Sequence, residues 1–422
     1  MAISSSYVKI PFAAGVVGSL PRPAHIKNML PNVPGFESVK AAGSLAMDTA
    51  VRYAINMQEM AGLDLVSDGE WRRHAYTHVI ADIVDGFTED NRESPHRWGI
   101  SITSPMEVKR SGLIAKEAQF LVASTIKATK VCIPSPYLLG VRLWEKSQSS
   151  AAYPTRDEFI EALVPILRNE LIGLQSTGVT IVQIDEPHLC VLVDENYRDL
   201  FDDPIYEMEF AVDKINQLID GIENVMFSLH LCRRNWGRQG WGAEGGYGPI
   251  MDAINKINVD QYVMEFSIPA AGDYSILKNL REDSFIGLGA VDCRFEKIES
   301  PATIVSRVEE AMKYVDRNRL SINPDCGFSP GMQSYMSIDE PYLKLKNESL
   351  ASQILRSKYL FLFVISSALI IIDQYTKFMI TLHIPLNYSV KVVEGFFNLT
   401  HIRNSGVAFG IFSDQQSELK PY

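Results

Sequence analysis

The chain has 422 residues, of which 46% are hydrophobic and 22% are charged, and these values are ordinary for a folded globular protein. They exclude low-complexity disorder, collagen and coiled coil, and the length allows two or three domains or one large barrel with an appendage. The net charge of −11 argues against nucleic-acid binding, because phosphate contacts need a surplus of Lys and Arg. Five cysteines are too few for a disulfide scaffold, so reduced thiols in the cytoplasm are expected.

The two ends of the chain differ in charge and hydropathy. Residues 351–422 carry six basic and four acidic residues and are much more apolar than residues 1–350, which carry the remaining net charge of −13. The amino-terminal residues lack a basic stretch followed by a sustained apolar run, so no secretory signal is predicted there. We therefore expect residues 1–350 to stay in the cytoplasm and treat the remainder as a separate segment.

Short β-rich runs alternate with helical patterns over residues 1–350. The predicted strands lie at 13–19, 63–70, 179–186, 225–232, 262–267, 285–292 and 320–326, and the clearest helices at 156–174, 206–222 and 301–315. This alternation is typical of a parallel sheet covered by helices. A doubly wound sheet is the rival, but no GxGxxG or Walker-type loop follows an early strand. Polar residues gather where the strands end, as at the active-site face of a (β/α)8 TIM barrel, so the barrel is predicted.

A candidate metal site begins with His230 and Cys232, which stand two residues apart at the end of a predicted strand. Side chains at i and i+2 of a strand point to the same side, so an imidazole and a thiolate converge there, as Zn²⁺ requires. Cys326 ends a later strand, and Glu265 lies in an apolar run where a carboxylate is costly unless it is paired or metal-bound. The alternative is that the spacing is accidental and both cysteines are buried structural residues.

Three further polar residues end predicted strands and extend the candidate active site. Ser19 ends the first strand, Glu70 the second and Asp185 the strand at 179–186. A single acidic strand end is more often a helix cap or an ion-pair partner. Several of them beside a possible metal pair indicate an active site without identifying its ligand.

The motifs at these strand ends are specific as an ordered set. They are Val17-Gly18-Ser19-Leu20-Pro21, Asp68-Gly69-Glu70, Gln183-Ile184-Asp185-Glu186-Pro187, His230-Leu231-Cys232-Arg233, Glu265, Gly287-Leu288-Gly289-Ala290-Val291-Asp292 and Pro324-Asp325-Cys326-Gly327. With them, residues 10–345 resemble the catalytic carboxyl-terminal barrel of the cobalamin-independent methionine synthase family, in its short single-barrel form.

The resemblance implies a zinc-dependent methyltransferase with a thiol acceptor, homocysteine in the synthase itself. It assigns zinc binding to His230, Cys232, Glu265 and Cys326. It assigns amino-acid binding to Ser19, Glu70 and Asp185, with Glu70 and Asp185 as the catalytic residues. A free thiol is mostly protonated at neutral pH, and coordination to Zn²⁺ converts it to the thiolate that accepts the methyl group.

Two departures from the family pattern leave the methyl donor open. Arg294 occupies the place of the family's histidine near the donor, and a guanidinium cannot donate a proton at neutral pH. The tryptophan that stacks on the folate ring has no clear counterpart, since residues 133–136 occupy that stretch. The donor could be a methylfolate, a corrinoid or another alkyl compound. A zinc-dependent alkyltransferase or lyase acting on another thiol, such as coenzyme M, is the alternative activity.

The carboxyl-terminal segment predicts a transmembrane helix at about residues 359–380, since about 22 residues at ~1.5 Å each cross a ~30 Å hydrocarbon core. Asp373 and Lys377 interrupt it four residues apart, where they can pair. Arg356 and Lys358 precede it, which favours a cytoplasmic amino side. The expected domains are a barrel at 1–347 and a membrane segment with a short β-rich fragment at 348–422.

Residues 350–413 resemble the start of lipoprotein signal peptidase, a bacterial membrane aspartic peptidase. The matching stretches are residues 372–377, 395–400 and 403–410. That family has two catalytic aspartates on later membrane helices, which this chain does not reach, so no peptidase activity is expected. A membrane protein of lipoprotein processing is therefore a third hypothesis that depends on the tail alone, and a fused or misassembled reading frame is the preferred account of the tail.

Overall fold

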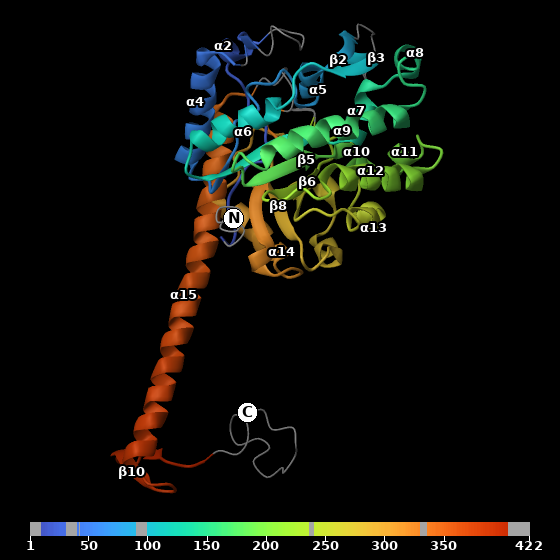
Figure 1. Cartoon of the computed structure of the whole chain (residues 1–422). Helices are drawn as coiled ribbons and strands as arrows, with labels where there is room; N and C mark the ends of the chain where they lie inside the picture. The colour runs from blue at the N-terminus through green and yellow to red at the C-terminus, as the bar shows by residue number, and fades with distance from the viewer. Residues whose placement is uncertain are drawn as a thin grey trace. The chain divides into compact units, whose positions relative to one another are not determined.

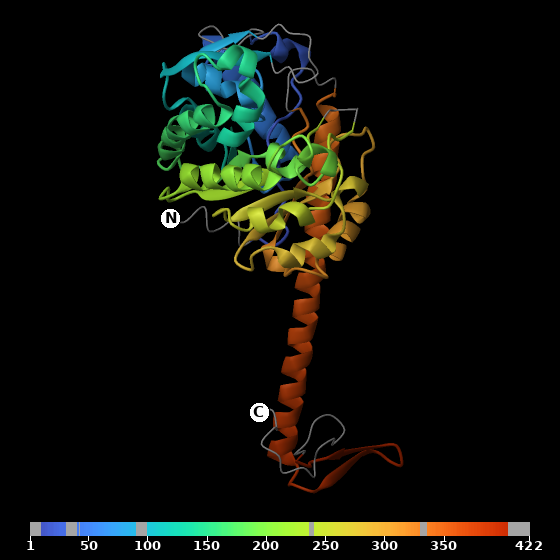
Figure 2. The same ribbon diagram turned by 90° about the vertical axis from the view of Figure 1, so that its right-hand side faces the viewer.

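The protein is represented by a computed structural model that describes residues 10–30, 40–41, 43–89, 99–235, 240–329 and 336–403. The chain divides into two compact units, Met1–Leu355 and Arg356–Tyr422. The first unit is built around parallel strands, and helices lie on the outer side of these strands (Figure 1, Figure 2). The second unit contains the end of a long helix and a small hairpin.

Seven parallel strands form the main sheet in the order β1-β4-β5-β6-β7-β8-β9. They are β1 (Leu65–Val66), β4 (Ala128–Pro134), β5 (Ile181–Asp185), β6 (Met226–Leu231), β7 (Gln261–Glu265), β8 (Phe285–Val291) and β9 (Leu320–Pro324). The register places Asp185 opposite His230 and Glu265 opposite Gly289. Because all strands run in one direction, the polar residues at their carboxyl ends meet at one end of the sheet.

Residues 12–15 close the sheet into a barrel between its first and last strands. Ala14 forms a parallel bridge with Ile322 of β9, and Ile322 N donates to Ala13 O (2.8 Å). On the other side, Leu65 N of β1 donates to Ala14 O (3.2 Å). The predicted (β/α)8 barrel is confirmed, with this segment as its eighth strand.

The opposite end of the barrel is apolar. Ala13, Leu65, Ile181 and Met226 form a buried cluster where their strands begin. Burying these side chains away from water stabilises the closed ring, and it leaves the carboxyl ends of the strands as the polar end.

Capping residues in the sequence explain where the main helices begin. Thr155 accepts the Glu158 amide (3.2 Å) ahead of α9, which spans the predicted residues 156–174. Asp203 caps α12 and a proline takes its first position, so this helix begins two residues earlier than predicted. The helices are α2 (Ala24–Lys27), α4 (Leu45–Ala61), α5 (Val79–Ile83), α6 (Leu113–Ala123), α7 (Pro136–Leu143), α8 (Lys146–Ser149), α9 (Arg156–Leu174), α10 (Pro187–Val191), α11 (Glu195–Arg198), α12 (Pro204–Ile219), α13 (Met251–Ile254), α14 (Pro301–Ala311) and α15 (Asp339–His383), with short 3-10 turns η1 (Tyr76–His78), η3 (Gly248–Ile250), η4 (Pro269–Ala271), η5 (Tyr274–Asn279) and η6 (Arg317–Arg319).

Several strands differ from the sequence-based expectation. The strand predicted at 63–70 is only Leu65–Val66, because Gly69 and Glu70 both adopt positive φ (69° and 59°) and turn the chain. Strand β4 was not predicted. An antiparallel hairpin, β2 (Val84–Glu89) with β3 (Ile100–Val108), was not predicted either.

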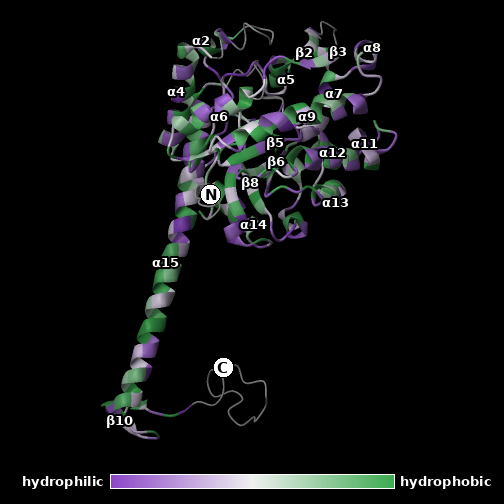
Figure 3. Ribbon diagram, in the orientation of Figure 1, coloured by the Kyte–Doolittle hydropathy of each residue, from purple (hydrophilic) through white to green (hydrophobic). Residues whose placement is uncertain are grey.

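The predicted transmembrane helix is the later part of α15. Helix α15 begins within the first unit, where Leu345, Glu348 and Leu355 are buried, and continues to His383 in the second. Beyond Leu355 it is largely hydrophobic and its apolar side chains are exposed (Figure 3). It is the one helix in the described residues that is long and apolar enough to cross a membrane.

The rest of the second unit is small. Strands β10 (Ser389–Val393) and β11 (Phe397–Thr400) form an antiparallel hairpin, in agreement with the expected β-rich fragment. Lys377 and Asp373 form the expected ion pair on α15 (2.7 Å). Residues 404–410 of the peptidase-like stretch lie outside the described residues.

Candidate active site

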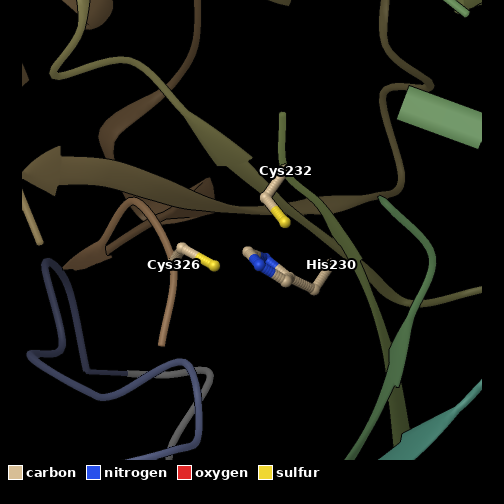
Figure 4. A group of neighbouring side chains, drawn as sticks. All are labelled: His230, Cys232 and Cys326. Atoms are coloured by element: carbon tan, nitrogen blue, oxygen red, sulfur yellow. The ribbon is translucent and has the colours of Figure 1, made fainter. Parts of the chain in front are cut away.

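Three of the four predicted metal ligands converge at the carboxyl end of the barrel. His230 lies in β6, Cys232 directly follows that strand, and Cys326 follows β9. One ligand atom from each lies within 4.8 Å of the other two, and the imidazole and both sulfur atoms point toward a common centre (Figure 4). Ligand atoms this close together are compatible with a site for one ion held by nitrogen and sulfur.

The surroundings of this cluster fit a metal cation. Both ring nitrogens of His230 are buried and make no hydrogen bond with the described residues, which is costly for an imidazole that binds nothing. A hydrogen bond from Cys326, together with the nearby His230, holds the pKa of Cys232 well below its usual range. The same hydrogen bond, a second one with Cys293, and burial raise the pKa of Cys326. One thiolate beside a buried imidazole is a donor set typical of a zinc site.

Glu265 lies at the end of β7 but is not a member of the three-residue group. Its Oε2 accepts the Arg233 amide (2.8 Å), and its Oε1 is bound by the Arg294 guanidinium. Arg294 also pairs with Asp325 (3.5 Å), and all three ionic side chains are fully buried. Arg294 therefore neutralises two buried carboxyl groups at the base of the cluster, a role that its sequence position alone did not reveal.

A second cluster joins Glu70 and Asp185 with Cys132, whose ligand atoms also lie within 4.8 Å of one another. Gln183 Nε2 donates to Asp185 Oδ1 (2.8 Å), and the Cys132 thiol donates to the backbone oxygen of Val17 (3.2 Å). Since Asp185 lies opposite His230 in the register of β5 and β6, the two clusters are neighbours. Sequence reasoning missed Cys132 because it missed β4, although the run Val-Cys-Ile before a proline is a strand signal.

Burial controls the protonation of the acidic pair. It raises the pKa of Glu70 to about 7 and that of Asp185 to about 6. The nearby Lys130 ammonium is also buried, which lowers its pKa to about 8, and it donates to Gln183 Oε1 (2.9 Å). Buried carboxyl groups with raised pKa values bind a cation in place of a proton, so this cluster suits the ammonium of an amino acid.

Glycine 18 allows the second cluster to form. A Cβ on Gly18 would lie 2.6 Å from Glu70 Oε1 and 2.8 Å from Cys132 Sγ, both far inside van der Waals contact. The next residue, Ser19, accepts the Ser329 amide on its hydroxyl (3.3 Å), an arrangement in which its O–H can still donate. Ser19 is thus fixed beside the chain that follows Cys326, between the two clusters.

Comparison with known proteins relates the two parts of the chain to two families. Residues 12–337 match the model of the family described as "Cobalamin-independent synthase, Catalytic domain", and residues 365–420 match that of "Signal peptidase (SPase) II". A methionine synthase of Thermococcus kodakarensis is 29% identical over 328 residues, which are 74% of this chain and 85% of that protein. An uncharacterized Bacillus subtilis protein, YxjH, is 24% identical over 354 residues, 79% of this chain and 91% of that protein.

A solved structure shares the fold. The B12-independent methionine synthase of Shewanella sp. W3-18-1, in complex with selenomethionine, superposes with a TM-score of 0.66 and 22% identity, covering 83% of this chain and 99% of that one.

Proposed function

Because residues 12–337 make this chain a member of the cobalamin-independent methionine synthase family, we propose that its barrel is a zinc-dependent enzyme that transfers a methyl group to homocysteine. The observation that carries the proposal is the juxtaposition of two clusters. His230, Cys232 and Cys326 form a nitrogen–sulfur site, and Glu70 and Asp185 form an adjoining site for an ammonium group. A thiol amino acid has one group for each.

The chain's own residues bind and orient the acceptor. Glu70 and Asp185 accept hydrogen bonds from its ammonium group, and the Ser19 hydroxyl donates to its carboxylate. Zinc held by the nitrogen–sulfur site supplies the chemistry of thiol activation, since it lowers the thiol pKa and leaves a thiolate nucleophile. The proposed transfer forms a sulfur–methyl bond and breaks the bond between the methyl group and its donor.

Glu265 remains the predicted fourth ligand. Its carboxylate is buried and fixed by Arg233 and Arg294, so it can contribute negative charge to the site whether or not it contacts the ion. Arg294 is committed to that carboxylate and to Asp325, and these acids together with Cys293 raise its pKa well above its usual range. Arg294 therefore gives the donor no proton. A methylfolate and a corrinoid both remain candidate donors.

An acceptor without an ammonium group, such as coenzyme M, fits the second cluster less well. It would leave Glu70 and Asp185 buried with no cation from the substrate, and unpaired buried charge is costly. Homocysteine is therefore favoured. A transfer assay with both thiols distinguishes them, and a preference for coenzyme M would contradict the assignment of the ammonium site.

Metal analysis of the purified full chain in detergent tests the zinc site. We expect about one Zn²⁺ per chain, and most of it lost in Cys232→Ala and in Cys326→Ala. Cys190→Ala is the matched control, because Cys190 is an equally buried thiol in α10 outside both clusters, and it should keep the metal. Full zinc occupancy in both ligand variants would refute the site, and no transfer to homocysteine from methyltetrahydrofolate or methylcobalamin would refute the activity.

We also propose that residues 359–380 insert into a membrane in the full chain. The apolar side chains of this part of α15 are exposed, which is unfavourable in water. Membrane fractionation after carbonate extraction should leave the chain in the pellet. Recovery as a soluble monomer would show that the segment does not span a membrane.

A further inference from the structure

A cluster of basic side chains lies outside the two groups already described. Arg142 of α7, His188 of α10 and Arg234, which follows Cys232 by two residues, form this arginine–histidine cluster. Arg142 Nε lies 3.1 Å from His188 Nε2, and Arg234 Nη2 lies 3.0 Å from His188 Nδ1. A guanidinium therefore faces each nitrogen of one imidazole ring.

This arrangement contains more donors than acceptors. A guanidinium carries only N–H donors, and a neutral imidazole has one N–H and one acceptor nitrogen. Burial and the two guanidinium charges hold the pKa of His188 well below its usual range, so the ring is neutral. If Nε2 accepts from Arg142, the N–H at Nδ1 points at another donor, Arg234. The contact between Arg234 and His188 thus joins two donors and lacks an acceptor.

The positive charge of Arg234 is not neutralised within the described residues. Arg234 forms no ion pair with a carboxylate there, its Nε is buried with no hydrogen-bond partner, and its other contact is with Tyr197, over whose ring it lies at 5.2 Å. The carboxyl group nearest in sequence to His188 is that of Glu186. It is used to cap α10, since it accepts the His188 and Leu189 amides (2.9 Å each).

The cluster borders the metal ligands. The side chain of Asn235 donates to Gly327 O (2.8 Å), which ties the chain beyond Arg234 to the residue after Cys326. The backbone oxygen of Arg234 accepts from Arg294 (3.0 Å). Arg142 lies over the Tyr76 ring at 5.2 Å. A ligand group held by the cluster would therefore lie beside the reacting sulfur.

We propose that Arg142, His188 and Arg234 bind a carboxylate or phosphate group of the methyl donor. An oxyanion between the three side chains accepts from both guanidiniums and from the imidazole N–H, which supplies the missing acceptor and the missing negative charge. The carboxylate of the acceptor amino acid is already assigned to Ser19 and its ammonium group to Glu70 and Asp185, so the anion belongs to the second substrate. This inference rests on the proposed methyltransferase function. A methylfolate would present a glutamate carboxylate, and a corrinoid would present its phosphodiester.

The backbone at Arg234 offers a variant that separates binding from folding. Arg234 has a φ of 63°, a conformation that glycine adopts without the strain a side chain causes. Arg234→Gly therefore removes the guanidinium without straining the fold. Asn224→Gly is the matched control, because Asn224 has a φ of 65° and precedes β6 at the end of the strand away from His230.

The test uses the full chain in detergent, with calorimetric titration of 5-methyltetrahydrofolate and of methylcobalamin as separate arms. For the donor that binds, Arg234→Gly should raise Kd about 10- to 100-fold, the size of one charge-assisted hydrogen bond. Zinc content and homocysteine KM should match those of Asn224→Gly, and the Kd of the wild type should rise more steeply with NaCl than that of Arg234→Gly. The arm that responds identifies the donor.

Two results overturn the inference in distinguishable ways. If a donor binds and Kd is the same in wild type and Arg234→Gly, the cluster is not its anion site, and the methyltransferase proposal is unaffected. If neither donor binds the wild-type chain and no methyl transfer occurs, the inference fails together with the proposed function.

Discussion

The barrel should need the part of α15 up to Leu355 in order to fold stably. The position at which the chain is truncated should therefore decide whether the barrel folds. The predicted boundary after residue 347 lies inside α15, whereas the compact units separate between Leu355 and Arg356. A chain ending at residue 347 and a chain ending at residue 357 both lack the membrane segment. We expect the longer chain to fold as a soluble barrel and the shorter one to be strongly destabilised.

The size of the effect follows from the contacts that the shorter chain loses. They are the hydrogen bonds from Gly15 N to Glu348 Oε1 (3.0 Å), from the Ser349 hydroxyl to Gly62 O (2.8 Å) and from the Ser352 hydroxyl to Phe12 O (2.5 Å). At about 1 kcal/mol each, with about 2 kcal/mol for burying Leu355, they contribute about 5 kcal/mol. The shorter chain also no longer has to bury the Glu348 carboxyl group, and this offsets part of the lost stability. A loss of about 4 kcal/mol is large beside a domain stability of about 5–15 kcal/mol.

Urea unfolding followed by circular dichroism measures the difference. Within the longer chain, Leu355→Ala should cost about 2–4 kcal/mol. Leu350→Ala, at a position that is 38% exposed, should cost under about 1 kcal/mol. Equal unfolding midpoints for the two truncated chains would refute the reasoning, because the barrel would then not need the contacts that α15 makes with the closing segment at residues 12–15.

Three further predictions concern the site. Gly18→Ala should displace the Glu70 carboxylate and raise the KM for homocysteine about 10- to 100-fold with the fold retained. Gly248→Ala, where a Cβ meets nothing within 4 Å, should have no effect on this KM. An unchanged KM in Gly18→Ala would contradict the ammonium site. Arg294→Met should lower the free energy of unfolding by about 3–5 kcal/mol, because the buried Asp325 loses its ion-pair partner and Glu265 keeps only Arg233 at 3.5 Å. Unchanged stability in urea unfolding at pH 7 would exclude this role of Arg294. Burial raises the folded-state pKa of Glu70 from 4.5 to about 7, so this carboxyl contributes stability fully below about pH 4.5 that is lost as pH rises to about 7. The loss in the free energy of unfolding should reach about 3 kcal/mol in the chelator-treated protein and should disappear in Glu70→Gln. Identical pH profiles of unfolding for the wild type and Glu70→Gln would show that Glu70 is not responsible.

The sequence determined the features that depend on near neighbours along the chain. Thr155 with Glu158 specified the start of α9, and Asp203 and Ser300, each followed by proline, specified the starts of α12 and α14. The regular alternation of strands and helices indicated the barrel, and the motif order indicated the family. The i, i+2 spacing of His230 and Cys232 on one strand predicted that their side chains converge, because strand geometry is local.

Other features were decided by the register of the sheet. Only the closed ring brings Cys326 to the end of β6, and only β4 brings Cys132 between Glu70 and Asp185. Whether Glu265 faces a metal or an arginine depends on Arg294, which approaches it from the loop after β8, the next strand of the sheet. Such contacts join residues that are remote in sequence. Their partners follow from how strands pair and twist around a common core, and the spacing of residues along one strand does not contain that information.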